Sequence, residues 1–156
     1  MSSGASDPAD IRGWQRLSPG ITTSGKIDDA DVARLAEIGT RHVINLALSD
    51  HPDALADEGH KLAERGMFYT HIPVPFDAPE ERHYLAFVAA LEAGDTPVHV
   101  HCIANWRVSA FFYRYHRERG MEEERARALM EQQWSPETHD HPAALAWAAL
   151  IATRRH

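Results

Sequence analysis

The chain has 156 residues, of which 44% are apolar, and this is the size and composition of one ordinary domain with a single hydrophobic core. Asp and Glu number 23 against 16 Lys and Arg, which gives a formal net charge of -7 at pH 7. Since no run of basic residues offsets this charge, nucleic acids and anionic membranes are poor partners, and any phosphate must bind at a local site.

Cysteine usage and the start of the sequence indicate the compartment. The single cysteine, Cys102, cannot form an intrachain disulfide. The first residues, MSSGASDPAD, lack the charged and then apolar pattern of a secretory signal. No apolar run approaches the roughly 18 residues that span a bilayer. We therefore expect a soluble, cytoplasmic protein.

The N-terminal part of the chain predicts a tail followed by strands. Residues 1–10 mix Ser, Gly, Asp and Pro without apolar periodicity, so we expect a flexible tail and a single domain over residues 11–156. From Trp14 to Thr23, apolar and polar residues alternate around a Pro-Gly pair. This alternation indicates one or two short edge strands joined by a turn.

Helices and strands alternate in the following segments. The strand segments are short apolar runs, and most of the helical segments have apolar residues on one face and a glycine at the end. The pattern implies right-handed crossovers and an α/β fold, with a mostly parallel central sheet flanked by helices and extra helices at the C-terminal end. Predicted strands are residues 41–48, 67–76 and 96–102, and predicted helices are residues 28–39, 53–66, 79–94, 107–120, 121–134 and 141–155.

The stretch PVHVHCIANWRVS, residues 97–109, places Cys102 between a predicted strand and a predicted helix. In an open α/β sheet, ligands bind beyond the carboxyl ends of the strands, where loops lead into helix N-termini. Backbone N–H groups of residues 103–107 and the positive end of the helix dipole would hold an anion at this point. The same field favours the thiolate, which is the nucleophilic form of cysteine.

The run VHVHC, followed by a short loop, an arginine and a serine that enters a helix, resembles the signature of the cysteine-dependent protein tyrosine and dual-specificity phosphatases. Residues 21–115 are also similar, in the order and spacing of their segments, to small bacterial phosphatase-like proteins of that superfamily. The resemblance implies a protein tyrosine phosphatase-like fold, no cofactor, and a phosphorylated substrate or a phosphate-like anion as partner.

The resemblance also implies roles for individual residues. Cys102 would attack phosphorus and form a phosphocysteine, and Ser109 would supply the hydroxyl that assists release of the thiolate. Asp77 would be the acid that protonates the leaving oxygen, because it lies in the loop after the corresponding strand; alternatively, Asp77 and Glu80 form a capping box of the next helix. Glu80 and Glu81 are further candidate acids. His101 would orient the loop, and the anion-binding positions would be His101, Ile103, Ala104, Asn105, Trp106 and Val108.

Arg107, the provisional phosphate ligand, departs from the family pattern. The family has five residues between cysteine and arginine, whereas CIANWR has four, and the family position falls on Val108. Either the loop is one residue shorter and Arg107 still folds over the anion, or the loop keeps its length and Arg107 lies one position early. Because Ser109 stands at the usual distance from Cys102, we favour the second explanation. Valine cannot replace a bidentate guanidinium, so activity would be weak or absent, and Trp106 would narrow the cradle.

Three functions therefore stay open. The chain hydrolyses a phosphate monoester through a phosphocysteine, or it binds a phosphorylated ligand without turnover, or Cys102 is a redox-sensing or structural cysteine. We do not expect a metal site. His99 and His101 face the same side of a strand beside Cys102, but a metal needs three or four converging ligands and the spacing supplies no others.

Overall fold

The computed structural model describes residues 6–153, and these contain one five-stranded sheet with the strand order β1-β2-β5-β3-β4. Four neighbouring strands run parallel, and β1 pairs antiparallel with β2. The mostly parallel sheet is confirmed, but β2 lies inside the sheet and only β1 of the first two strands is at an edge. The strands are β1 (Gln15–Ser18), β2 (Ile21–Ser24), β3 (His42–Asn45), β4 (Phe68–His71) and β5 (Val98–His101).

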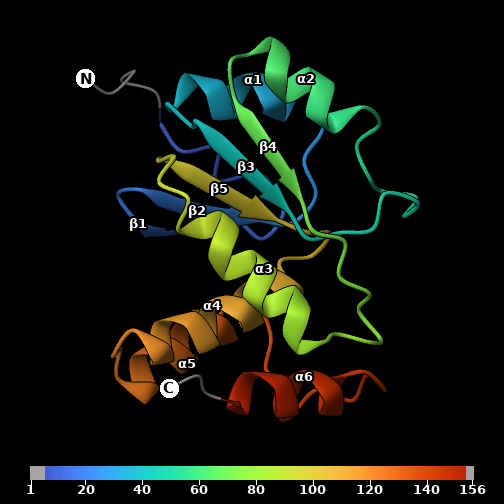
Figure 1. Cartoon of the computed structure of the whole chain (residues 1–156), viewed down its shortest axis with the longest axis vertical. Helices are drawn as coiled ribbons and strands as arrows, with labels where there is room; N and C mark the ends of the chain where they lie inside the picture. Colours follow the sequence, from blue (N-terminus) through green and yellow to red (C-terminus); the bar gives the residue numbers. More distant parts are fainter. Residues whose placement is uncertain (1–5, 154–156) are drawn as a thin grey trace.

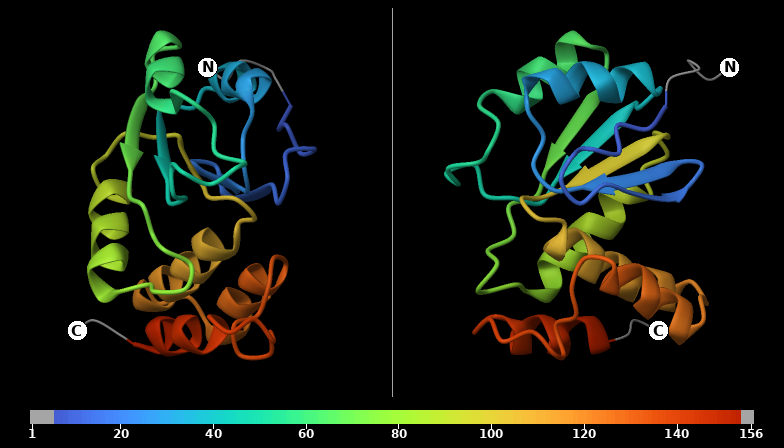
Figure 2. Two further views of the ribbon diagram at one scale, coloured as in Figure 1. Left: turned by 90° about the vertical axis from the view of Figure 1, so that its right-hand side faces the viewer. Right: turned by 180° about the vertical axis from the view of Figure 1, so that it is seen from behind.

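Helices cover both faces of the sheet (Figure 1). Val43 and Ile44 are adjacent in β3 and are both fully buried, each in a different hydrophobic cluster, because successive side chains of a strand point to opposite faces. On one side of the sheet in Figure 1 lie α1 (Asp29–Glu37) and α2 (Glu58–Glu64), and on the other lie α3 (Glu81–Leu91), α4 (Trp106–Glu118), α5 (Glu123–Glu131) and α6 (Ala144–Ala152). Figure 2 shows the same arrangement from the side and from behind.

Helix α2 begins at Glu58, five residues later than the sequence pattern predicts. Residue Asp57 before it has the left-handed backbone φ of 54°, which interrupts a helix. Packing explains the glycine at position 59, because a Cβ there would lie 2.9 Å from the ring of Tyr69 in β4. A glycine therefore lets α2 approach the sheet closely.

The predicted N-terminal tail is partly attached to the domain. Residues 1–5 lie outside the described residues. Asp7 accepts hydrogen bonds from the guanidinium of Arg16 at 2.6 and 2.7 Å, and Asp10 pairs with Arg34 of α1. Any flexible part of the tail therefore ends before Asp7. Among the residues that the structure describes, no helix is long and apolar enough to cross a membrane.

The parallel register brings four polar residues to one edge of the sheet. Ser24, His101, Asn45 and His71 are the last residues of β2, β5, β3 and β4, and the register pairs each with its neighbour. Cys102 follows this row directly. The carboxyl ends of parallel strands are the usual ligand-binding edge of an open α/β sheet, so the fold places the cysteine where the sequence predicted it.

Candidate active site

Cys102 lies at the end of β5 and is only 1% exposed. Its amide donates to the carbonyl of Ser24 in the neighbouring strand over 3.3 Å, which extends the β2–β5 ladder by one residue. The side chain belongs to the hydrophobic cluster on the α3–α4 face of the sheet. The thiol is therefore buried on the α3–α4 face of the sheet, at the start of the loop that leads into α4.

The cysteine loop, residues 103–105, is held by the N-terminal part of the chain. The carbonyl of Ile103 accepts the amide of Lys26 at 2.9 Å, and a Cβ on Gly25 would lie 2.4 Å from the same oxygen, so only glycine permits this contact. Asn105 is fully buried and donates to the carbonyl of Gly13 at 2.7 Å and to Thr23 Oγ1 at 3.0 Å. Its φ of 67° is a conformation that asparagine tolerates better than most residues.

The N-terminus of α4 presents donors without protein acceptors. The N-cap Asn105 makes no side-chain capping bond. Within residues 6–153, the amide N–H groups of residues 103–108 donate to no other part of the chain, and the first N–H to be bonded is that of Ser109, to the Asn105 carbonyl. Unpaired amides and the positive end of a helix dipole together form a suitable site for an anion.

Arg107 stands in the first turn of α4, since the helix begins at Trp106, one residue before the predicted range of 107–120. Its side chain is 7% exposed, and Nη1 donates to the carbonyl of Val74 at 2.8 Å, in the segment after β4. The guanidinium carbon lies 5.9 Å from the ring centre of Phe76. Arg107 therefore reaches from the cysteine loop to the segment that carries Asp77.

The side chains of Val108 and Trp106 both pack against other parts of the chain. The Val108 side chain is 0% exposed and packs in the core, so only the backbone N–H of this residue is left to face an anion. The Trp106 ring stacks on Trp134, with 5.0 Å between ring centres and 7° between planes. The ring is thereby engaged with the C-terminal part of the chain, and a narrowing of the anion cradle by Trp106 stays a prediction.

Ser109 bonds within its own helix. Its hydroxyl donates to the carbonyl of Trp106 at 3.2 Å, as serines in helices commonly do. It also lines a cavity of about 10 Å³ together with Thr23 and His116. In this arrangement the hydroxyl has a backbone partner, so support of a thiolate by Ser109 would need the hydroxyl to rotate.

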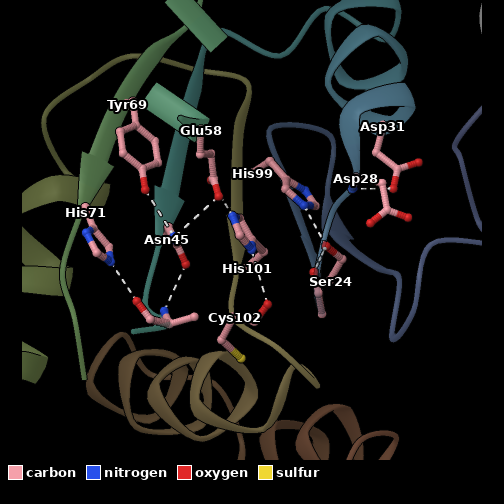
Figure 3. A network of polar contacts seen from close by, with 12 residues as sticks. Ser24, Asp28, Asp31, Asn45, Glu58, Tyr69, His71, His99, His101 and Cys102 are labelled. Carbon is pink, nitrogen blue, oxygen red and sulfur yellow. Dashed lines mark hydrogen bonds and ion pairs between the residues drawn. The ribbon is translucent and has the colours of Figure 1, made fainter. Parts of the chain in front are cut away.

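A polar network lies behind Cys102, on the α2 side of the sheet (Figure 3). His101 Nε2 is 2.6 Å from Glu58 Oε2, and His101 Nδ1 is 3.2 Å from the carbonyl oxygen of Cys102. Both side chains of this pair are 4% exposed. Both ring nitrogens of His101 therefore lie within hydrogen-bond distance of an oxygen. The network fixes the ring of His101 and, through the carbonyl, the backbone of the cysteine.

Asn45 links this network to β4. Its Nδ2 donates to Tyr69 Oη at 3.1 Å and to Glu58 Oε1 at 3.4 Å, while its Oδ1 accepts the amide of Ala47 at 2.9 Å. Burial raises the pKa of Tyr69 to about 12, and the negative charge of Glu58 acts in the same direction. The phenol therefore stays neutral and can serve as a hydrogen-bonding partner throughout the physiological pH range.

His99 is a structural residue of the same strand. Its ring nitrogens lie 2.8 Å from Thr22 Oγ1 and 2.8 Å from Ser24 Oγ, and its ring stacks on Trp14. Complete burial holds its pKa well below the usual value, and the neighbouring His101 acts in the same direction. Both nitrogens are occupied, and residues 6–153 contain no group of three or more His, Cys, Asp or Glu side chains that could hold a metal ion.

Asp77 lies in the loop between β4 and α3 and is exposed to solvent. The capping box of α3 is formed by Glu80 and His83, so the alternative in which Asp77 takes part in that box is wrong. Glu80 pairs with Arg82, and Glu81 pairs with the fully buried Arg114 at 2.6 Å. Of the three candidate acids, Asp77 alone has no ion pair among the described residues.

Phe76 fixes the loop that carries Asp77. Its ring contacts those of Trp106, Trp134 and Trp147, with ring centres 5.8, 5.5 and 5.9 Å away. Its carbonyl accepts the indole N–H of Trp147 at 2.7 Å. The segment from Val74 to Asp77 is thereby tied to Arg107 on one side and to helix α6 on the other.

Sequence reasoning missed two sets of residues in this site. Glu58 lies 43 positions before His101, and the sequence pattern places it only within a predicted helix. Trp134 and Trp147 are buried, and nothing in the sequence pattern indicates the acceptors of their indole N–H groups. Asn105 offers no such signal, because an asparagine just before a helix is more often an extended N-cap residue than a left-handed one.

Residues 13–113 match the family of the phosphatase-like domain of beta-lactamase hydrolase-like proteins. The chain belongs to this family. No curated protein matches the sequence. The matched range contains the whole polar network and the cysteine loop, and it ends within α4, before Trp134 and Trp147.

Solved structures agree with this family. A candidate phosphatase of the DUF442 group from Shewanella putrefaciens is 30% identical, with a TM-score of 0.78 over 94% of this chain and 93% of that chain. A Cys-to-Ser variant of P. aeruginosa TpbA in complex with pTyr is 19% identical, with a TM-score of 0.69 over 96% and 88%. The core catalytic domain of a PP-IP phosphatase from S. cerevisiae, in complex with citrate, is 11% identical, with a TM-score of 0.72 over 93% and 88%. The phosphatase-like domain therefore has the fold of the cysteine-dependent tyrosine and dual-specificity phosphatases.

Proposed function

We propose that this phosphatase-like domain hydrolyses a phosphate monoester through a phosphocysteine intermediate on Cys102. The observation that carries the proposal is the junction of β5 and α4. It combines the only cysteine of the chain, the unpaired amides of residues 103–108 and a guanidinium in the first helical turn. Family membership and the phosphatase fold support the same reaction class.

The reaction has two steps. The Cys102 thiolate attacks phosphorus, the bond between phosphorus and the ester oxygen breaks, and the protonated Asp77 carboxyl transfers its proton to the leaving alkoxide or phenoxide. A water molecule then attacks phosphorus, the sulfur–phosphorus bond breaks, and Asp77 takes the proton of the water. Inorganic phosphate and the thiolate are released, so that protons and charge balance over one cycle.

The anion would be held by the loop amides and by Arg107. Arg107 follows Cys102 after four residues, one fewer than in the family pattern, and this spacing is compatible with phosphate binding. The helix already begins one residue before Arg107, and the Val108 side chain belongs to the core. Arg107 would exchange its bond to the Val74 carbonyl for a phosphoryl oxygen, which is a charge-assisted and therefore stronger partner. Ser109 would turn its hydroxyl from the Trp106 carbonyl toward the thiolate.

A second candidate is a domain that binds an anion without turnover. The observation that favours it is the closed state of the site, in which Cys102 is 1% exposed and Arg107 is bonded to backbone. An anion that releases Arg107 from Val74 but leaves Asp77 in solvent would be bound and not cleaved. Burial gives less support to a redox sensor, because sensor cysteines are accessible thiolates.

Hydrolysis of an aryl phosphate by the wild type and by Cys102→Ser tests the proposal. The TpbA complex with pTyr supports an aryl ester as the probe. The expected result is turnover by the wild type and a loss of about a thousandfold or more in the variant. Turnover that survives in Cys102→Ser would refute the nucleophile, and phosphate binding without turnover by either protein would favour the binding domain. We also propose a cytoplasmic location, in keeping with a single unpaired cysteine.

A further inference from the structure

Two tryptophans from the C-terminal part of the chain each bind the peptide unit that precedes a candidate catalytic residue. Trp147 Nε1 donates to the carbonyl of Phe76 at 2.7 Å, and the next residue is Asp77. Trp134 Nε1 donates to the carbonyl of Trp106 at 2.8 Å, and the next residue is Arg107. Because the peptide unit is planar, a bond to its carbonyl also fixes the N–H and the Cα of the following residue.

The environment makes these bonds strong anchors. Trp147 is fully buried and Trp134 is 5% exposed, so the alternative to each bond is an unsatisfied indole N–H in the core. The rings also pack against the segments whose carbonyls they hold, Trp147 against Phe76 and Trp134 against Trp106. Each tryptophan thus holds one segment by both a hydrogen bond and a ring contact.

The two anchors come from outside the family match. That match ends at residue 113, whereas Trp134 follows α5 and Trp147 lies in α6. The loop between them also contacts the site, because His139 packs edge-on against Trp106 at 4.7 Å and His141 against Phe76 at 4.9 Å. The C-terminal helices therefore do more than cover the core, since they reach both segments that flank the cysteine loop.

We propose that Trp147 is a positioning residue for the general acid and Trp134 is a positioning residue for the phosphate-binding arginine. Trp147 holds the peptide before Asp77, so that the carboxyl stays within reach of the leaving oxygen although the loop is otherwise exposed. Trp134 holds the first turn of α4, so that the Arg107 side chain and amide keep their direction toward the anion. This inference rests on the proposed phosphatase function.

The separation of roles gives a kinetic signature. Protonation by a general acid matters for a poor leaving group such as phenol and hardly at all for 2,4-dinitrophenol, which departs as a stable anion. In the second step Asp77 acts with both esters alike, so the comparison uses kcat/KM, which reports only the steps up to formation of the phosphocysteine. Loss of the Trp147 anchor should therefore lower kcat/KM for phenyl phosphate alone. Loss of the Trp134 anchor should affect both esters alike, because phosphoryl binding is common to both.

Trp147→Phe and Trp134→Phe form a matched pair, since each removes one indole N–H and keeps an aromatic ring. We expect Trp147→Phe to lower kcat/KM for phenyl phosphate about tenfold or more and to change kcat/KM for 2,4-dinitrophenyl phosphate less than about twofold. Trp134→Phe should lower kcat/KM for both esters by a similar factor and weaken the binding of inorganic phosphate. The thermal unfolding midpoint of each variant shows how much the substitution destabilises the fold, apart from its effect on catalysis.

A double-mutant cycle with Asp77→Asn separates positioning from general loss of structure. If Trp147 acts through Asp77, Trp147→Phe has no further effect on kcat/KM for phenyl phosphate in the Asp77→Asn background. An equal loss of kcat/KM with both esters, or a further loss in that background, would overturn the inference. Should Trp147→Phe fail to fold, Phe76→Leu removes the ring contact between the loop and Trp147 and is compared with the two esters in the same way. A wild type that hydrolyses neither ester refutes the proposed function itself, which is a distinct outcome.

Discussion

The two sides of the cysteine loop are held by different kinds of side-chain interaction. Behind Cys102, on the α2 side, Glu58, His101 and Asn45 form a buried network of hydrogen bonds. In front of it, on the α6 side, Phe76 and Trp106 are packed among aromatic rings. The polar network holds the backbone of the cysteine by side-chain hydrogen bonds, whereas ring packing and two indole N–H bonds hold the acid loop and the first turn of α4. The nucleophile therefore has a polar support, and the acid and the arginine have an aromatic one.

Arg107 belongs to the front side, and its removal should have the largest effect among the flanking residues. Arg107→Ala should lower kcat/KM by about a hundredfold or more, comparable with the loss of one oxyanion donor, and should abolish measurable binding of inorganic phosphate. Arg65→Ala, an exposed arginine at the end of α2, is the control and should change neither quantity. Unchanged phosphate affinity in Arg107→Ala would show that the guanidinium stays on the Val74 carbonyl.

Val108→Arg in the Arg107→Ala background sharpens this result. Because Val108 is fully buried, an arginine there should lower the thermal unfolding midpoint and restore no activity. Recovery of activity would revive the explanation in which Val108 occupies the place of the family arginine.

Glu58→Gln tests the polar side. The variant keeps the size of the side chain but removes a charged acceptor from His101, and a hydrogen bond to a charged group contributes about 2 kcal/mol. We expect a lower unfolding midpoint and a decrease in kcat of about tenfold. Glu64→Gln, on the exposed side of the same helix, is the matched control. A wild-type kcat in Glu58→Gln would mean that the network does not influence the cysteine.

The smallest expected effect concerns pH and stability. Burial lowers the pKa of His116 from 6.5 to about 4, and the charge of Arg125 acts in the same direction. The unfolded chain therefore binds a proton near pH 6.5 that the folded chain binds only near pH 4, so stability should fall as pH decreases through this window. His99, on the polar side, acts in the same direction. His116→Gln should flatten the pH dependence of the unfolding midpoint, whereas the exposed His60→Gln should leave it as it is; equal slopes in all three proteins would contradict this account.

Much of the fold followed from the sequence because local signals agreed with the tertiary structure. The alternation of short apolar runs and amphipathic segments predicted the parallel sheet, and Gly39 and Gly66 marked helix ends that the structure confirms with positive φ values. The start of α2 was misplaced because residues 53–57 have helical composition but lead into the left-handed Asp57. Propensity alone does not reveal such an interruption.

The site was predictable only where its residues are adjacent in the chain. Cys102, Arg107 and the loop amides lie within one short stretch, so a motif could indicate them. Glu58 and Trp147 reach the site through the fold, from 43 residues before His101 and 71 residues after Phe76. A glutamate at a helix start and a tryptophan in an apolar helix are ordinary features of a sequence. Their roles follow from the tertiary contacts alone.

The central claim is that Cys102 forms a covalent bond to phosphorus. Its most direct test is the mass of the protein after mixing with 2,4-dinitrophenyl phosphate and rapid acid quenching. We predict one added phosphoryl group on the peptide that contains Cys102, and none in Cys102→Ser. Turnover of the ester without this adduct, or an adduct on another residue, would contradict the account.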